Sequence, residues 1–287
     1  MTAVLIAMLI GCEPAATDAE FGDQVTDAGG TGGDATAGPD VKAATGMTGQ
    51  WLIAVDWSTC VSFGAAPFEL RTRKLLLSDI THKGHKVLEK RQVCTVENTN
   101  LIGLKTVVPK PVAQGPGVLD VKGSVMGQGE GAAYSSGAEV QLWGAKLSDP
   151  LADLMPTTSD ASNPALADTD NDGKPGATLV VPKICEIYVT QRAIASLIGT
   201  FDKDGRIVGK GQHTTEQHVL KATKPICAQK YTTSPNDPHN NFVMQRADSV
   251  AGADANKDGK VDCEEIAKIQ SKLIKWAQAD HDRCPQP

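Results

Sequence analysis

The stretch Trp51-Leu52-Ile53-Ala54-Val55-Asp56-Trp57 decides the fold class. Large apolar residues occupy positions 51, 53, 55 and 57, and they alternate with Leu52, Ala54 and Asp56. A period of two matches the alternation of side chains along a β-strand, and it does not match the 3.6-residue period of a helix. We therefore predict that the body of the protein begins with a strand.

Runs with the same character continue along the chain, separated by Gly and Pro. They lie at 70–80, 86–96, 101–108, 118–126, 139–147, 177–181, 186–191, 195–201, 206–209 and 217–222. Residues 201–206 predict a tight hairpin turn with Gly205 at the left-handed position. Segment 242–249 alternates and is predicted as a last strand rather than a short helix. We therefore expect a mainly β fold, an antiparallel β-barrel or sandwich over residues 47–247.

The charge of the chain is concentrated near its start. The 287 residues carry a net charge of −6, and residues 13–46 account for it with seven acids against Lys42. The remainder is close to neutral, so no basic field is expected to attract nucleic acid or anionic lipid. Segment 13–46 has almost no large apolar side chain, which predicts a disordered acidic tether.

The first residues have the character of an export signal. Residues 3–10 form an apolar run too short to span a bilayer, and Leu9-Ile10-Gly11-Cys12 follows. This tetrapeptide resembles the lipobox of bacterial lipoproteins, although residues 1–8 contain no Lys or Arg. The resemblance implies a signal peptide at 1–11 and a lipid on Cys12. It also implies attachment to the bacterial cell envelope, at the outer membrane rather than the inner one, with the body in the periplasm or on the cell surface. The alternative is a buried apolar N-terminus with a chance cysteine.

The remaining cysteines predict disulfide bonds. Six are left when Cys12 is set aside, and an even number in an exported chain is typical of paired thiols. Sequence neighbours suggest the pairs Cys60–Cys94, Cys185–Cys227 and Cys263–Cys284.

The segment Asp254–Glu265 predicts a calcium site. Its twelve residues place side-chain oxygens at positions 1, 3, 5, 9 and 12, a backbone carbonyl at position 7 and Gly259 at position 6. This order resembles the EF-hand loop, in which a hard cation takes several oxygen ligands and the glycine allows a sharp turn. The resemblance implies one Ca²⁺, held by Asp254, Asn256, Asp258, Lys260, Asp262 and Glu265.

Residues 248–287 form a C-terminal unit around this loop. An amphipathic helix is predicted over 264–280, with Ile266, Ile269 and Leu273 on its apolar face. The unit resembles half of a dockerin module, in which a second loop pairs through the residue that matches Val261. With one loop present, Val261 packs on the body, pairs with another copy, or stays exposed.

A second acidic segment, Asp168-Thr-Asp170-Asn-Asp172-Gly173-Lys174, predicts another calcium site. It resembles the Asp-rich loops of thrombospondin type 3 repeats, which implies ligands from Asp168, Asp170, Asp172 and the Lys174 carbonyl. Position 12 is Leu179, so Asp160 or a nearby carbonyl is expected to complete the shell and to fix the connection 148–176 to the strand at 177. A solvated Asp/Gly turn is the alternative.

Gly49-Gln50-Trp51 resembles the G-x-W motif of lipocalin-type barrels. That resemblance implies that Arg246, on the last strand, packs over Trp51. The alternative is that Trp51 is an ordinary core residue and Arg246 lies on the surface.

No arrangement of residues points to catalysis. His213 and His218 lack the H-E-x-x-H spacing, and an odd separation on a strand puts them on opposite faces. We therefore expect a calcium-binding, lipid-anchored envelope protein that is not an enzyme, whose β domain is structural or binds a protein or a small apolar ligand. A dockerin-like interaction module and a calcium-dependent envelope hydrolase are the alternatives.

Overall fold

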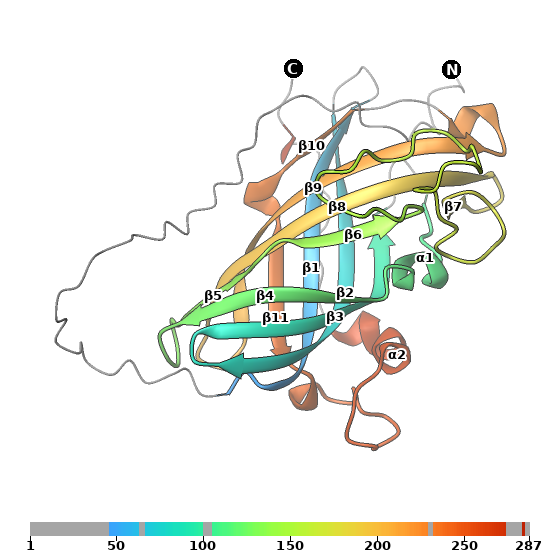
Figure 1. The fold of residues 1–287 in the computed structure, drawn as a ribbon. Helices are drawn as coiled ribbons and strands as arrows, with labels where there is room; N and C mark the ends of the chain where they lie inside the picture. Colours follow the sequence, from blue (N-terminus) through green and yellow to red (C-terminus); the bar gives the residue numbers. More distant parts are fainter. Residues whose placement is uncertain (1–45, 63–66, 100–104, 229–231, 274–282, 285–287) are drawn as a thin grey trace, which may run out of the picture.

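The strands form one antiparallel sheet that closes on itself (Figure 1). A computed structural model describes residues 46–62, 67–99, 105–228, 232–273 and 283–284. The strands are β1 (Gly49–Ser62), β2 (Phe68–Lys83), β3 (Lys86–Asn98), β4 (Val118–Met126), β5 (Ala133–Ser136), β6 (Glu139–Trp143), β7 (Ala177–Val181), β8 (Cys185–Phe201), β9 (Ile207–Ala222), β10 (Thr232–Pro235) and β11 (Asn241–Arg246). The helices are α1 (Lys110–Gln114) and α2 (Cys263–Leu273), with short 3₁₀ turns at Pro225–Cys227, Asp237–His239 and Ala247–Ser249.

Closure comes from strand β1, which pairs with β2 on one edge and with β11 on the other. The ring runs β1–β2–β3–β4–β5–β8–β9–β11 and returns to β1. Strands β5, β6 and β7 lie one after another along the same long strand β8. β10 pairs with the end of β1. The fold is thus an antiparallel β-barrel, and the mainly β prediction is confirmed.

Glycines make room for aromatic rings inside this barrel. A Cβ on Gly211 would lie 2.4 Å from ring atoms of Trp57, and a Cβ on Gly209 would lie 2.8 Å from the ring of Phe242. Both rings are buried. Because a small barrel has no space for large side chains on facing strands, these two strand glycines allow the rings to fill the core.

A second apolar cluster lies outside the barrel. Helix α2 and the loop before it cover the outer face of β1 and β2, where Val261 and Ile266 pack with Leu52 and Leu77. The cluster also contains Ala54, Leu75, Cys94, Ala247, Ala253 and Cys263. The C-terminal unit is therefore a cover on the barrel wall (Figure 1). Neither α1 nor α2 is long and apolar enough to cross a membrane.

The disulfides are Cys60–Cys284, Cys94–Cys263 and Cys185–Cys227. The predicted pairs Cys60–Cys94 and Cys263–Cys284 are wrong, whereas Cys185–Cys227 is confirmed. Cys60 and Cys94 lie on β1 and β3, under the C-terminal segment, so each meets a cysteine from the end of the chain. Covalent bonds thus hold the cover at two points.

Several strand predictions need correction. The runs 186–191 and 195–201 are one strand, β8, and the runs 206–209 and 217–222 are one strand, β9. In the run 101–108, residues 100–104 lie outside the described residues, and 105–108 contains only an isolated bridge at Val107. The run 139–147 is a strand only as far as Trp143. The short strands β5 and β10 were not predicted.

The predicted hairpin at 201–206 is confirmed. Asp202 and Arg206 close it with a backbone hydrogen bond of 2.8 Å, and Gly205 has a φ of +73°. The Asp202 carboxylate accepts hydrogen bonds from the Asp204 and Arg206 amides. Hydrogen bonds among residues 202–206 thus hold the turn in its conformation.

Candidate metal loops and barrel interior

The C-terminal acidic loop has a tightly wound backbone. Lys257 and Gly259 both have positive φ, +60° and +83°. The Asp254 carboxylate accepts hydrogen bonds from the Asp258 and Gly259 amides, at 3.1 and 3.0 Å. The chain therefore wraps round the first carboxylate of the loop.

Glu265 reaches back into the same loop from the first turn of α2. Its carboxylate accepts from the Ala255 amide at 2.8 Å and from the Asp262 amide at 3.1 Å. Asp262 in turn accepts from the Glu265 amide at 2.9 Å, which completes a capping box at the helix start. The side chain of Glu265, at position 12, thus points into the loop, where its oxygens accept hydrogen bonds from backbone amides.

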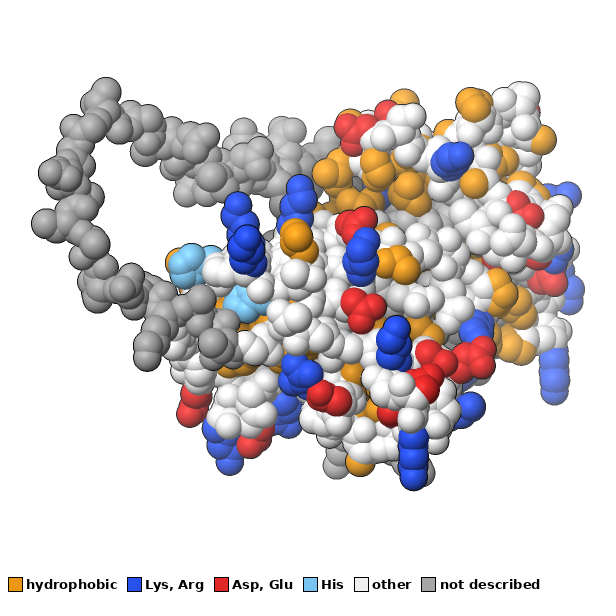
Figure 2. Space-filling model, turned by 60° about the horizontal axis from the view of Figure 1, so that its bottom comes forward, with side chains coloured by type: hydrophobic (Ala, Val, Ile, Leu, Met, Phe, Trp, Pro, Cys, Tyr) orange, Lys and Arg blue, Asp and Glu red, His pale blue; other side chains and the backbone are white. Residues whose placement is uncertain are grey.

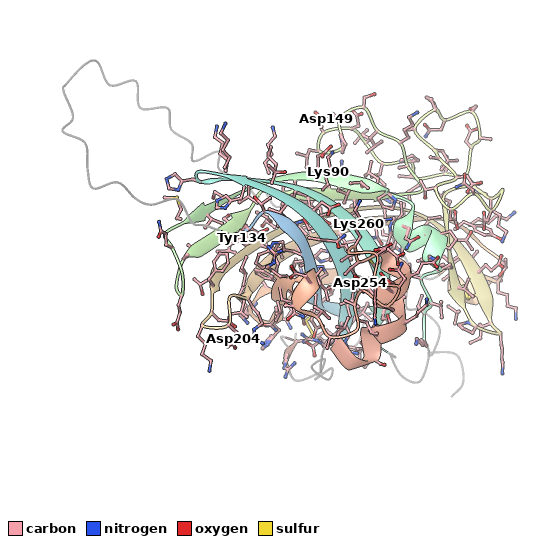
Figure 3. The ribbon with its side chains drawn as sticks, turned by 90° about the horizontal axis from the view of Figure 1, so that it is seen from below. Lys90, Tyr134, Asp149, Asp204, Asp254 and Lys260 are labelled. Carbon is pink, nitrogen blue, oxygen red and sulfur yellow. A yellow bond between two sulfur atoms is a disulfide. The ribbon has the colours of Figure 1, made fainter. Side chains whose placement is uncertain are left out.

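The loop is joined to the barrel by an unusual pair of hydrogen bonds. The side-chain amide of Gln50, on β1, donates to the Val261 carbonyl and accepts from the Val261 N–H, both at 2.8 Å. This one side chain thus satisfies both backbone polar groups of Val261. Of the three possibilities for Val261, the structure thus shows packing on the body. Seen from below, the loop bearing Asp254 and Lys260 lies against the barrel wall (Figure 3).

The first acidic loop has the same local conformation. Asn171 and Gly173 have φ of +58° and +79°. The Asp168 carboxylate accepts from the Asp172 and Gly173 amides at 3.2 and 2.8 Å, and the Lys174 amide donates to Asp172 at 2.9 Å. Position for position, these bonds match those of Asp254 and Asp258 in the C-terminal loop.

The first loop also brings its carboxylates closest together. Of the His, Cys, Asp and Glu side chains in the described residues, only Asp168, Asp170 and Asp172 form a group of three with ligand atoms within 4.8 Å of one another. Oδ1 of Asp170 is buried and has no hydrogen-bond partner within the described part of the chain. Burial raises the pKa of Asp170, and the neighbouring carboxylates of Asp172 and Asp168 add to this rise. An orphaned oxygen among crowded acids fits a hard cation.

Strand β7 fixes this loop in place. Thr178 donates its backbone N–H to Asp170 at 3.1 Å and its hydroxyl to Asp172 at 2.6 Å. The expected connection between the loop and the start of this strand is therefore present. Asp160 instead accepts from the Ser162 amide in its own turn, and the Lys174 ammonium lies 3.4 Å from Asp172.

The barrel interior holds charges that the sequence did not single out. Arg91 donates to Glu89 and Glu139 at 2.9 Å each and to Tyr134 at 2.7 Å. Gln141 links Glu139 to the buried ammonium of Lys74. Along the run 86–96, alternate residues face opposite sides of the strand, and both sets contain polar and apolar side chains. The sequence therefore did not show which set faces the interior.

The charged network leaves little space around it for a ligand. Two cavities lined by inward-facing residues have volumes of about 10 and 90 Å³. Pockets for drug-sized ligands are on the order of 300–1,000 Å³. Neither of these two has room for a drug-sized apolar ligand. A third cavity, lined by Met47, Trp51 and Phe201 together with polar residues, has a volume of about 380 Å³, which is within that range.

No family model, curated protein or solved structure matches this chain.

Trp51 and Arg246 are direct cross-strand partners, and the Arg246 guanidinium lies against Gly49, where a Cβ would be 3.1 Å away. His213 stacks on Trp57 inside the barrel, whereas His218 is bonded to Glu216. Cys12 and the segment 13–45 lie outside the described residues, as does the part of the predicted helix after Leu273.

An open groove of about 730 Å³ separates the C-terminal loop from the outer faces of β2, β3 and β4. Its wall carries Asp79, Lys90 and Asp120, which are successive cross-strand neighbours of alternating charge. The lower face shows the same mixing of Lys and Arg with Asp and Glu (Figure 2). A mixed surface of this kind does not favour a polyanion such as nucleic acid.

Proposed function

We propose that this protein is a calcium-binding structural protein of the bacterial cell envelope. The observation that carries the proposal is the shared conformation of the two acidic loops, each wound round its first aspartate. Bound Ca²⁺ would supply a positive centre that many oxygens can share, which relieves the repulsion among the acids. The ligands are Asp168, Asp170, Asp172 and the Lys174 carbonyl in one loop, and Asp254, Asn256, Asp258, the Lys260 carbonyl, Asp262 and Glu265 in the other.

In this proposal the Ca²⁺ ions stay bound and stabilise the fold, and their binding does not act as a signal. The first loop joins the connection before β7 to that strand, and the second joins the C-terminal cover to β1 through Gln50. The bonds of Gln50 to Val261 take the place of a second EF-hand loop, and so disfavour the opening motion of paired sensor loops. Calcium at extracellular levels saturates sites with a Kd of roughly 10⁻⁴–10⁻³ M.

The envelope location is supported by two features. Three disulfides are typical of an oxidising compartment. The lipobox-like Leu9–Cys12 and the acidic segment after it favour a lipid anchor followed by a tether.

The interaction-module alternative has weaker support. Ile266 is buried, and Ile269 and Leu273 pack on the cluster that it shares with the barrel. The apolar face considered for a partner is therefore already covered in the described part of α2.

Calcium removal tests the proposal. We expect chelation by EDTA to lower the Tm of the soluble fragment 47–287 by about 5–10 °C, since each site at tenfold excess of ligand adds about 1.4 kcal/mol. Excess Ca²⁺ should restore the Tm.

Variants of each loop assign the effect. Asp170→Asn and Asp258→Asn should each remove part of the calcium-dependent shift, and the double variant should remove all of it. Asp204→Asn, in the acidic hairpin turn between β8 and β9, is the matched control and should keep the full shift. A wild-type Tm that is the same in Ca²⁺ and in EDTA would contradict the proposal.

A further inference from the structure

The cavity of about 90 Å³ at the end of the barrel is lined by both apolar and polar side chains. Its lining includes the apolar residues Leu70, Val108 and Leu179 together with Lys74 and Trp143. The other lining residues are mostly polar: Thr59, Thr72, Asn98, Gln191, His213, Thr215, Gln217 and Thr233. Lys74 also lines the smaller cavity deeper in the barrel, so this side chain borders both cavities. Leu70 is four residues from Lys74 along β2, which places it two side-chain steps nearer the barrel end.

The ammonium of Lys74 is short of acceptors. It donates one hydrogen bond, to Oε1 of Gln141 at 2.8 Å, and Lys74 makes no ion pair within 4.0 Å among the described residues. Glu139, the nearest buried acid, is engaged by Arg91 and Gln141. Burial lowers the pKa of Lys74, and Glu139 offsets this only in part.

The indole of Trp143 adds a second unsatisfied donor. Its Nε1 is buried and has no hydrogen-bond partner in the described part of the structure. Trp143 lies two residues after Gln141 on β6, so both side chains point to the same side of the strand. Trp143 and Lys74 both line this cavity, and an indole N–H can only donate.

We propose that this cavity binds a short-chain carboxylate, with its oxygens accepting from Lys74 Nζ and Trp143 Nε1. Two donors, one of them charged, call for an anionic acceptor, because an unpaired buried ammonium is costly. The apolar lining residues Leu70, Val108 and Leu179 can pack against an alkyl group, which a bare inorganic ion lacks. The volume equals that of about three waters at roughly 30 Å³ each, which corresponds to acetate or propionate.

The wild-type protein provides the decisive test. We would label its indoles with ¹⁵N, hold Ca²⁺ constant, and titrate acetate, propionate and, at equal ionic strength, chloride. The chain has four tryptophans, and the Trp143 resonance is the one missing in Trp143→Phe. We expect the chemical shift of this resonance to change and to reach saturation as acetate or propionate is added. Chloride should leave it unchanged.

Variants define the role of each donor. Lys74→Met keeps most of the stem without the charge, and should weaken carboxylate binding at least about tenfold, as expected for a lost charged hydrogen bond. Lys90→Met, which removes an exposed lysine from β3, should leave binding unchanged. A Trp143 resonance that is unmoved by carboxylates, or moved equally by chloride, would overturn the proposal even if Lys74→Met does not fold.

Discussion

At the scale of single residues, the packing of Trp57 requires a glycine, which has no side chain, at position 211. Its ring fills the space that a Cβ on Gly211 would enter, and it stacks on His213 with ring centroids 4.9 Å apart. Strand glycines usually weaken a sheet, since they lose more entropy on folding and pack less. Here the glycine is needed for the packing of the largest ring in this part of the barrel.

Gly211→Ala should therefore destabilise the protein, although alanine is the smallest possible change. We expect a loss of about 1–3 kcal/mol from overpacking, measured by urea unfolding. Trp57→Phe removes the ring atoms that the new methyl would meet, so the same substitution should be less harmful in that background. An equal loss in both backgrounds would contradict the contact.

His213 should make stability depend on pH. Burial and the Lys74 ammonium lower the pKa of His213 to about 3, below its ordinary value of 6.5. Between these values the unfolded chain binds a proton that the folded chain does not, so stability falls as the pH drops from about 6.5 toward 3. The slope from this residue is at most about 1.4 kcal/mol per pH unit.

His213→Gln should flatten this slope, as measured by urea unfolding at several pH values. His85→Gln, which replaces an exposed imidazole in the β2–β3 turn, should leave it unchanged. A slope that is the same in His213→Gln and wild type would show that other groups cause it.

At the scale of elements, the C-terminal loop depends on one side chain of β1. Gln50 offers both a donor and an acceptor to Val261, so a single residue joins the loop to the wall. Gln50→Ala should cost about 1–3 kcal/mol for two lost bonds, and Gln50→Glu, which keeps only the acceptor, should fall between. Gln212→Ala removes an exposed glutamine from β9 and should have little effect in the same urea titration.

Most of the strands, but not all of them, could be predicted from the sequence. Alternation located most strands correctly, because side-chain period is a local property. It missed β5 and β10, which are four residues each, polar and, in β10, ended by Pro235. The local wrapping of both acidic loops followed from Asp and Gly spacing. The contact of Val261 with Gln50 did not, because it joins residues 211 positions apart.

At the scale of the whole molecule, an ion-paired network fills the centre of the barrel. Arg91 is the link between Glu89, Glu139 and Tyr134, which come from three different strands. Burial raises the pKa of Tyr134, so its hydroxyl stays a neutral donor to Glu89. Sequence alternation could not reveal this network, because closure of the ring decides which face of each strand is interior.

Arg91→Met should be among the most harmful single substitutions in the barrel. It leaves the carboxylates of Glu89 and Glu139 buried without their partner, which costs about 3–5 kcal/mol. Adding Glu89→Gln and Glu139→Gln should recover much of this loss, because the remaining groups are then neutral. A triple variant no more stable than Arg91→Met in urea would contradict the network.

The three disulfides also determine what happens when the backbone is cut. They are nested: Cys185–Cys227 lies within Cys94–Cys263, which lies within Cys60–Cys284. A single proteolytic nick anywhere between residues 60 and 284 therefore leaves both fragments joined by at least one bond. In an environment rich in proteases, a nicked molecule would stay in one piece until its disulfides were reduced.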